Sequence, residues 1–184
     1  IDSNPTSVIV DAAGKVRDLS AWYHYAIVWN TPESSPTNRI KIYKNGILQT
    51  FTSESTTPQY PGINANITHF NSPQKHTIGY ADSYGGSAFY QYYLADIYFI
   101  DGQALGPEYF GKTDTATGAW IAKAYDGTTN ETGTPSSSSD YDTLYGSNGF
   151  LLDFRASSLV YSGSTLSTIN DVSGRTTPNN WTAN

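Results

Sequence analysis

The sequence predicts an all-β chain that folds as an antiparallel two-sheet β-sandwich, and three observations lead to this expectation. Trp22–Trp29 is rich in aromatic and β-branched residues and lacks Gly and Pro, which favours a strand over a helix. Arg39–Lys44 alternates apolar and polar residues, and the Asn45-Gly46 pair that follows is the strongest short-range hairpin signal in a sequence. The 184 residues include 15 Tyr and 4 Trp against 14% charged residues, a composition typical of aromatic-rich sandwiches and barrels.

The first half of the chain contains the clearest strand patterns. Trp22–Trp29 is expected to be internal to its sheet, because neither of its alternating faces is polar enough for open water. The apolar residues of Arg39–Lys44 share one face, so that strand is expected to be half-buried. After the turn, Ile47–Phe51 should return antiparallel to it. Shorter strands are expected at Ser7–Val10, Ile67–Phe70 and His76–Tyr80.

In the second half, Phe89–Ile100 is a long apolar and aromatic run that predicts one long strand. An Asp101-Gly102 turn should end it. Pro107–Phe110 predicts one helical turn, because a proline at the start of a helix has no hydrogen bond to lose. Thr128–Ser139 has low complexity and predicts an inserted surface loop, which costs little stability.

Several motifs resemble a known family. Trp-x-His at 22–24 and Ile-x-Ile-Tyr-x-Asn-Gly at 40–46 together resemble the laminin-G-like, concanavalin A-like lectin jelly roll. Four further segments, in this order, resemble the lectin-like repeats of large structural proteins of tailed viruses, especially marine bacteriophages: Ala95–Leu105, Pro107–Gly111, Gly118–Trp120 and Tyr145–Phe154. The resemblance covers about Asp18 to Phe154, and it implies a jelly-roll fold and a virion component.

The resemblance also suggests a domain organisation. Residues 1–154 are expected to form the lectin-like β-sandwich domain, incomplete at its N-terminus, because several strands precede the Trp-x-His strand in the family and only 21 residues precede it here. Residues 155–184 are expected to be a C-terminal extension. Asp171–Gly174 and Asn179–Thr182 resemble elements that lead into another lectin-like module, so this extension should either close the sandwich as an edge strand or begin a following module.

Charge and motif content argue against several function classes. A net charge of −6 with scattered basic residues argues against nucleic-acid binding. No apolar run approaches the ~20 residues of a membrane span, so membrane insertion is not expected. The chain has no Cys, its four Glu do not fit the Glu-x-Asp-x-x-Glu pattern of jelly-roll glucanases, and Gly-x-Ser-x-Gly is absent. The sequence therefore predicts a protein that is not an enzyme.

Two sets of loop residues are candidates for ligand binding. An aromatic platform beside small and polar loop residues suits a glycan, although an ordinary hairpin would have the same composition. The candidates for this glycan site are Tyr80, Asp82, Tyr84, Gly85 and Gly86. Related lectin-like domains often hold calcium at the sandwich rim, and Asp140 and Asp142 would present two carboxylates on one side of a loop. Asp82 and Asp101 are further calcium candidates, the alternative being that all four are turn formers, and no other cofactor is expected.

The expected function is a non-enzymatic structural or adhesive module at the virion surface, either a capsid decoration protein or a tail or fibre component. Its expected partners are other virion proteins or copies of itself, and its rim loops could hold a host surface glycan. One alternative is a receptor-binding carbohydrate lectin domain of a tail fibre. Another is a cellular extracellular lectin-like domain.

Overall fold

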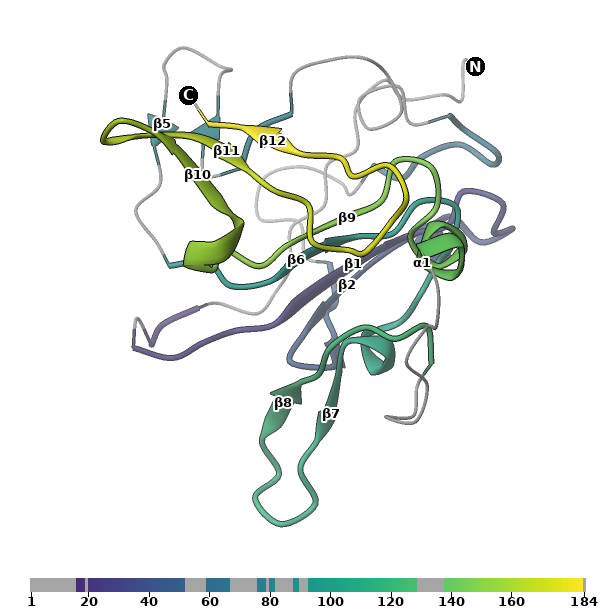
Figure 1. Ribbon diagram of the computed structural model, residues 1–184. Helices are drawn as coiled ribbons and strands as arrows, with labels where there is room; N and C mark the ends of the chain where they lie inside the picture. The colour runs from purple at the N-terminus through teal and green to yellow at the C-terminus, as the bar shows by residue number, and fades with distance from the viewer. Residues whose placement is uncertain are drawn as a thin grey trace. The chain divides into compact units, whose positions relative to one another are not determined.

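The computed structural model consists mostly of short antiparallel strands with almost no helix (Figure 1). The structure describes residues 16–18, 20–51, 59–66, 76–78, 80–81, 88–89, 93–128 and 138–183. The helical elements among them are the 3₁₀ turns η1 (Pro36–Asn38), η2 (Pro107–Tyr109) and η3 (Ala156–Ser158) and the α-helix α1 (Ser138–Tyr145). The all-β prediction is therefore confirmed, whereas the two-sheet jelly roll stays a prediction. No helix in these ranges has the length and hydropathy of a membrane span.

The chain separates into two compact units. The first unit combines Ile1–Ser72 with Ala104–Gly133, and the second combines Pro73–Gln103 with Thr134–Asn184. Each unit therefore joins two segments that are distant in the sequence. The predicted division of the chain at residue 154 stays a prediction.

A three-stranded antiparallel sheet forms the centre of the first unit. Its strands, in spatial order, are β1 (Tyr25–Trp29), β2 (Ile40–Lys44) and β3 (Ile47–Leu48). Asn45 (φ +49°) and Gly46 (φ +76°) both have left-handed backbone conformations, as a type I′ turn requires. The predicted hairpin is thus confirmed, with Lys44 opposite Ile47.

The strand predicted over Trp22–Trp29 is shorter in the structure. It begins at Tyr25, and among the described residues β1 pairs with β2. Residues 22–24 would need partners beyond Lys44, where the Asn45-Gly46 turn reverses the chain. The expectation that this strand is internal to its sheet stays a prediction.

Arg39 secures the polar loop between β1 and β2. Its guanidinium is buried and donates hydrogen bonds to the carbonyl oxygens of Glu33 (2.8 Å), Ser34 (2.9 Å) and Pro61 (2.9 Å). These bonds satisfy both the buried donors and the loop carbonyls, which would otherwise be costly to bury. The loop therefore has a defined conformation although it lacks sheet pairing.

A hairpin of β7 (Gly111–Thr113) and β8 (Trp120–Ala122) completes the described part of the first unit. The turn η2 precedes it, with a proline in its first turn, which confirms the helical turn predicted there. The Phe110 and Tyr125 rings stack beneath the hairpin, 5.1 Å apart between centroids. Burial raises the pKa of Tyr125 to about 12.

The second unit contains several small antiparallel sheets. They are β4 (Tyr80–Ala81) with β5 (Ala88–Phe89), β6 (Ile97–Phe99) with β9 (Phe150–Leu152), and β10 (Leu159–Ser162), β11 (Thr165–Ile169) and β12 (Trp181–Thr182) in that order. Its core includes Leu152, which is 0% exposed, and Tyr145. Phe99 stacks on Phe150, and Trp181 contacts the Phe150 ring edge-on with 5.2 Å between centroids. The C-terminal segment therefore ends as an edge strand whose Trp packs on β9.

The single long strand predicted over Phe89–Ile100 is wrong. Residues 93–96 lie outside any strand, and Asp96 has φ +44°, a left-handed conformation that a continuous strand cannot contain. The turn at Asp101-Gly102 is confirmed by Gly102, whose φ is +82°. Of the strand predicted at His76–Tyr80, only Tyr80 belongs to a described strand, and residues 76–78 do not. The strands predicted at 7–10 and 67–70 lie outside the described residues.

Asp171 connects the C-terminal segment to β9. Asp171 is 8% exposed, and its carboxylate accepts hydrogen bonds from the backbone N–H groups of Leu151 (2.9 Å), Ser173 (2.9 Å) and Asn179 (2.8 Å). Hydrogen bonds from a backbone N–H to a carboxylate are among the strong ones, and here they replace missing ladder bonds. The loop between β11 and β12 is therefore folded around this one side chain.

We expect Asp171→Ala to destabilise the protein by about 2–4 kcal/mol, because it leaves one buried and two part-buried N–H donors without their acceptor. Urea unfolding followed by circular dichroism measures this loss. Val172→Thr is the matched control, because Val172 is exposed and should change stability by less than ~0.5 kcal/mol. Equal stability of the two variants would contradict the role given to Asp171.

Candidate functional site

The sheet of the first unit exposes a set of apolar side chains on one face. Residues opposite each other in an antiparallel sheet point to the same side, and the register places Tyr25, Ile27, Ile42 and Ile47 together, here named the Ile27 patch. Ile27 is 65% exposed and Ile47 is 69% exposed, whereas Ile40 on the same face is buried. One end of this face is thus covered and the other is open.

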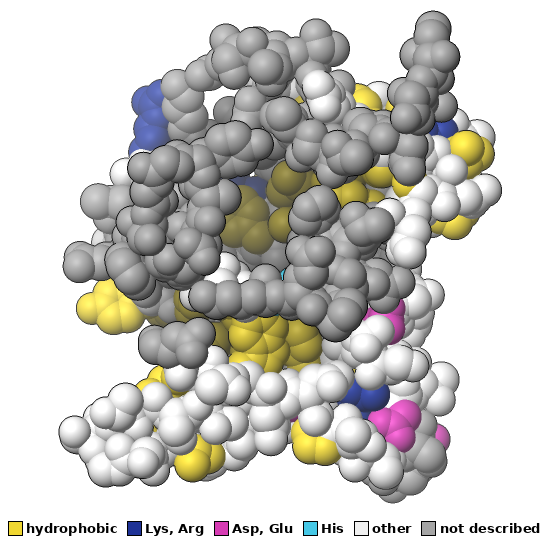
Figure 2. Space-filling model, turned by 90° about the horizontal axis from the view of Figure 1, so that it is seen from above, with side chains coloured by type: hydrophobic (Ala, Val, Ile, Leu, Met, Phe, Trp, Pro, Cys, Tyr) yellow, Lys and Arg dark blue, Asp and Glu magenta, His cyan; other side chains and the backbone are white. Residues whose placement is uncertain are grey.

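One charged side chain, that of Lys44, lies on the same face as the Ile27 patch. Lys44 lies between Tyr25 and Ile47, and its ammonium is 5.9 Å from the centroid of the Tyr23 ring, within cation–π range. On the surface seen in Figure 2, hydrophobic side chains of the described residues emerge in several places and few charged ones are in view. Contiguous exposed apolar side chains on a folded surface mark sites of protein–protein contact.

The Trp120 indole holds the hairpin turn of this sheet in place. A Cβ atom added to Gly46 or to Gly111 would overlap the Trp120 ring, so the ring lies directly against both glycine backbones. The His24 ring is also adjacent, with 5.6 Å between the ring centroids. Asn45 ties His24 to the turn, because its side-chain oxygen accepts the His24 N–H at 2.8 Å. Residues of three separate sequence motifs therefore contact one another in one cluster: His24 of Trp-x-His, the Asn45-Gly46 turn and Trp120 of Gly-Ala-Trp.

The environment of His24 favours its neutral form. Burial lowers its pKa, since a charged imidazolium loses solvation there. Its Nδ1 and the Trp120 Nε1 are buried without a hydrogen-bond partner among the described residues. The contact with an indole and a backbone turn gives this histidine a packing role.

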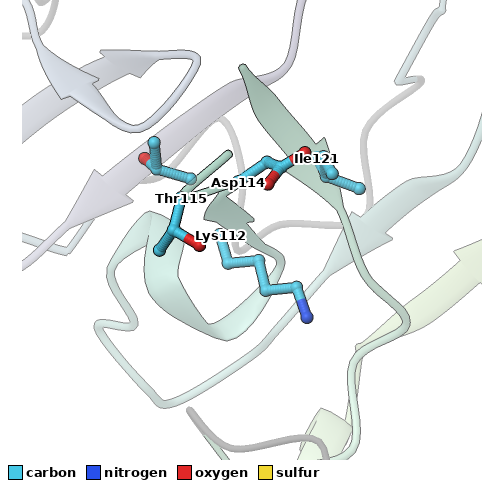
Figure 3. A pocket seen from close by; sticks show the side chains of 5 residues that line it. Lys112, Asp114, Thr115 and Ile121 are labelled. Carbon is cyan, nitrogen blue, oxygen red and sulfur yellow. The ribbon is translucent and has the colours of Figure 1, made fainter. Parts of the chain in front are cut away.

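An open hollow of about 370 Å³ lies at the β7–β8 hairpin (Figure 3). Its lining residues are Lys112, Thr113, Asp114, Thr115 and Ile121. The Asp114 carboxylate closes the hairpin turn by accepting hydrogen bonds from the Ala116 N–H (2.8 Å) and the Thr117 hydroxyl (3.0 Å), which lower the pKa of Asp114. In Figure 3 the Lys112 side chain extends away from that carboxylate. The Asp114 carboxylate therefore serves the turn, and it does not converge with the Lys112 ammonium on a common point.

The residues predicted to bind a glycan are only partly described. Tyr80 lies in β4, opposite Phe89 of β5. The other predicted residues, Asp82, Tyr84, Gly85 and Gly86, lie outside the described residues. The glycan site therefore stays a prediction.

The calcium candidates Asp140 and Asp142 lie on α1, so the loop expected there is wrong. With 3.6 residues per helical turn, residues two apart point to different sides of a helix and cannot present their carboxylates together. Hydrogen bonds from Thr176 and, to a lesser extent, the charge of Arg175 lower the pKa of Asp142. Among the described residues no group of three or more acidic, His or Cys side chains could hold a metal ion.

Asp101, another calcium candidate, belongs to the turn after β6. Its carboxylate accepts hydrogen bonds from the backbone N–H (3.1 Å) and the side-chain amide (2.9 Å) of Asn148. The Asp-Gly motif and the Tyr-Gly-Ser-Asn-Gly motif, which lie far apart in the sequence, are thereby joined. These motif residues maintain the fold of the second unit.

Arg175 is a residue whose role the sequence patterns did not identify. Its guanidinium donates to the carbonyl oxygens of Ser147 (2.9 Å) and Gly149 (2.9 Å), and the Asn179 amide donates to the Gly149 carbonyl as well (2.9 Å). Carbonyl oxygens gathered in this way could bind a cation, but here an arginine already occupies them. The sequence feature that could have pointed to Arg175 is its position directly after the Asp-Val-Ser-Gly element.

Comparisons with protein-family models, with curated proteins and with solved structures found no match to this chain. The resemblance to lectin-like repeats of viruses therefore rests on the sequence motifs alone. The candidate site rests on the geometry of the first unit.

We expect Gly46→Ala to cost about 3 kcal/mol, because the new Cβ overlaps Trp120 and the backbone has a positive φ. Gly118→Ala is the matched control. Gly118 also has a positive φ (+71°), but an added Cβ would meet nothing, so this variant should lose only about 1 kcal/mol. Chemical denaturation of both variants measures the difference, and equal losses would exclude a specific contact between Trp120 and the turn.

We expect His24 to make stability fall as the pH decreases from 7.5 to 5.5. Its pKa in the folded state is below the usual 6.5, so the unfolded state binds more protons in this range and is favoured by acid. His24→Gln should reduce this dependence, because the amide does not titrate. Urea unfolding midpoints measured at several pH values test this prediction. If the slope of the midpoint against pH were the same in the variant and in the wild type, the burial effect on His24 would be contradicted.

Proposed function

We propose that this chain is a non-enzymatic structural or adhesive module of a virus particle, which binds other virion proteins or copies of itself. It would have a lectin-like two-sheet jelly roll and would act at the virion surface. The single observation that carries the proposal is the Ile27 patch, an exposed apolar surface on a well-ordered sheet.

Burial of this surface by a partner would be favourable. Apolar area removed from water contributes roughly 25 cal/mol per Å², and Ile27 and Ile47 both expose about two thirds of their surface. The β2–β3 hairpin that carries Ile47 is held by the type I′ turn and by the Trp120 contact, and β1, which carries Ile27, pairs with β2. Because the surface is already ordered, little conformational entropy would be lost on binding.

The virion assignment is supported by the order of the motifs. Ala95–Leu105 and Tyr145–Phe154 resemble segments of viral lectin-like repeats, and their strands β6 and β9 pair directly, with Phe99 opposite Phe150. Motif residues that contact each other preserve a fold and leave the binding surfaces free to vary. The resemblance therefore supports the type of module, and the Ile27 patch supports its mode of action.

We expect peptides of this chain to fractionate with intact particles in a density gradient of virions from the source that encodes it. Mass spectrometry of the fractions measures this, and particles disrupted before centrifugation are the control. We also expect the purified chain to bind no sugar on a glycan array. Glycan binding that is lost in Asp82→Ala and Tyr84→Ala would instead support a receptor-binding lectin, and recovery at cell surfaces without particles would support a cellular lectin-like protein.

A further inference from the structure

The sequence contains two Asn-Gly pairs, and both lie in turns: Asn45-Gly46 in the first unit and Asn148-Gly149 in the second. Asn followed by Gly is prone to spontaneous deamidation, because a residue without a Cβ leaves its backbone nitrogen free to approach the Asn side chain. In both turns the chain must open locally before that nitrogen reaches the side-chain carbonyl carbon. The folded structure therefore determines which pair reacts.

The two side-chain amides have opposite hydrogen-bond polarity. The Asn45 side-chain oxygen accepts the His24 backbone N–H at 2.8 Å, which stabilises negative charge that develops on this oxygen during attack. The Asn148 amide nitrogen instead donates to the Asp101 carboxylate at 2.9 Å. A neighbouring negative charge disfavours the charge that attack would create there. Asn45 is therefore the better electrophile.

The peptide that follows Asn148 is held by several hydrogen bonds. The Gly149 carbonyl oxygen accepts from the Arg175 guanidinium (2.9 Å) and from the Asn179 amide (2.9 Å). The Gly149 N–H donates to the Gly146 carbonyl oxygen (3.4 Å). Attack requires this peptide to rotate about the Cα–C bond of Asn148, which breaks these bonds. Exposure alone would favour this pair, because Asn148 is exposed and Asn45 is half-buried, but the bonds of Gly149 oppose it.

The turn at Asn45 is held in a way that interferes less with the reaction. Rotation about the Cα–C bond of Asn45 moves the Gly46 peptide but leaves in place the two bonds that join Asn45 to His24. Gly46 itself packs against the Trp120 ring, and β3 after the turn is two exposed residues long. Opening here disturbs an apolar contact and a short strand, whereas at Asn148 it breaks bonds to a charged group.

We propose that Asn45 is a site of spontaneous deamidation in the folded chain and that Asn148 is protected. The Gly46 nitrogen attacks Cγ of Asn45, so that a C–N bond forms, the Cγ–Nδ2 bond breaks, and ammonia leaves with the proton of the Gly46 nitrogen. Water then opens the cyclic succinimide. Addition of water at Cγ gives aspartate, and addition at the backbone carbonyl carbon gives isoaspartate.

The two products would affect the sheet differently. Aspartate keeps an oxygen that can accept the His24 N–H. Isoaspartate adds a methylene to the main chain of a two-residue turn, so the register with Lys44 opposite Ile47 is lost and the Ile27 patch with it. Deamidation would thus limit the lifetime of the patch as a binding surface. This consequence rests on the proposed function, whereas the modification itself does not.

Peptide mapping by mass spectrometry of the purified chain, incubated at neutral pH, measures the exchange of amide for carboxyl at both positions. Isoaspartyl methyltransferase labels the isoaspartate product. In urea both sites should react at similar rates, because the dipeptide is the same. In the folded chain Asn45 should react ~10-fold faster than Asn148 or more, since each hydrogen bond that must break at Gly149 slows attack several-fold.

Two variants test the protection of Asn148. Arg175→Gln removes a donor to the Gly149 carbonyl oxygen, and Asp101→Asn removes the negative charge beside the amide. Each should raise the rate at Asn148 several-fold and leave the rate at Asn45 within ~2-fold of the wild type, because both changes lie in the second unit. Circular dichroism checks that both variants fold. Equal rates at the two positions in the folded wild type, or an intact Asn45 long after the unfolded chain has reacted, would overturn the proposal.

The outcomes also separate this inference from the proposed function. A chain that fractionates with virus particles and keeps Asn45 intact would overturn the modification and leave the virion function standing. A chain that deamidates at Asn45 but is absent from particles would support the modification and contradict the virion function.

Discussion

The register of the β1–β2–β3 sheet depends on the backbone conformation of two residues, Asn45 and Gly46. Their positive φ angles form the turn that places Lys44 opposite Ile47, and the Asn45 side chain extends the same register to His24. A shift by one residue would move every side chain of a strand to the other face. The Ile27 patch exists only because this turn excludes the alternative register, and Trp120 excludes any residue larger than glycine beside it.

A few charged side chains organise the irregular parts of both units. In the first unit Arg39 bonds to three carbonyl groups, and in the second Asp171 accepts three backbone N–H groups while Arg175 bonds to two carbonyls. Most of the bonded backbone groups lie outside the sheets, and Asp171 also bonds to Leu151 in β9. In a chain with only 14% charged residues, these groups replace the ladder bonds that long strands would otherwise supply.

The sequence by itself determined the features that depend on neighbouring residues. The Asn45-Gly46 hairpin, the helical turn that begins at Pro107, the turn at Asp101-Gly102 and the all-β class all follow from local backbone preferences, and all are present in the structure. The candidate site was predictable only in part. The strand that carries Ile27 was recognised, but its start at Tyr25 was not, and the glycan candidates lie mostly outside the described residues.

Only the tertiary structure decided which residues meet across long separations in the chain. The left-handed Asp96 interrupts an apolar run that reads as one strand, and the helix at Asp140 and Asp142 replaces an expected loop. Of the three N–H donors that surround Asp171, Ser173 and Asn179 lie within eight residues of it, but Leu151 is 20 residues away in β9, and no local pattern could indicate that contact. The physical reason is that burial and strand pairing depend on partners distant in the sequence, whereas turn conformation is fixed by the residues of the turn itself.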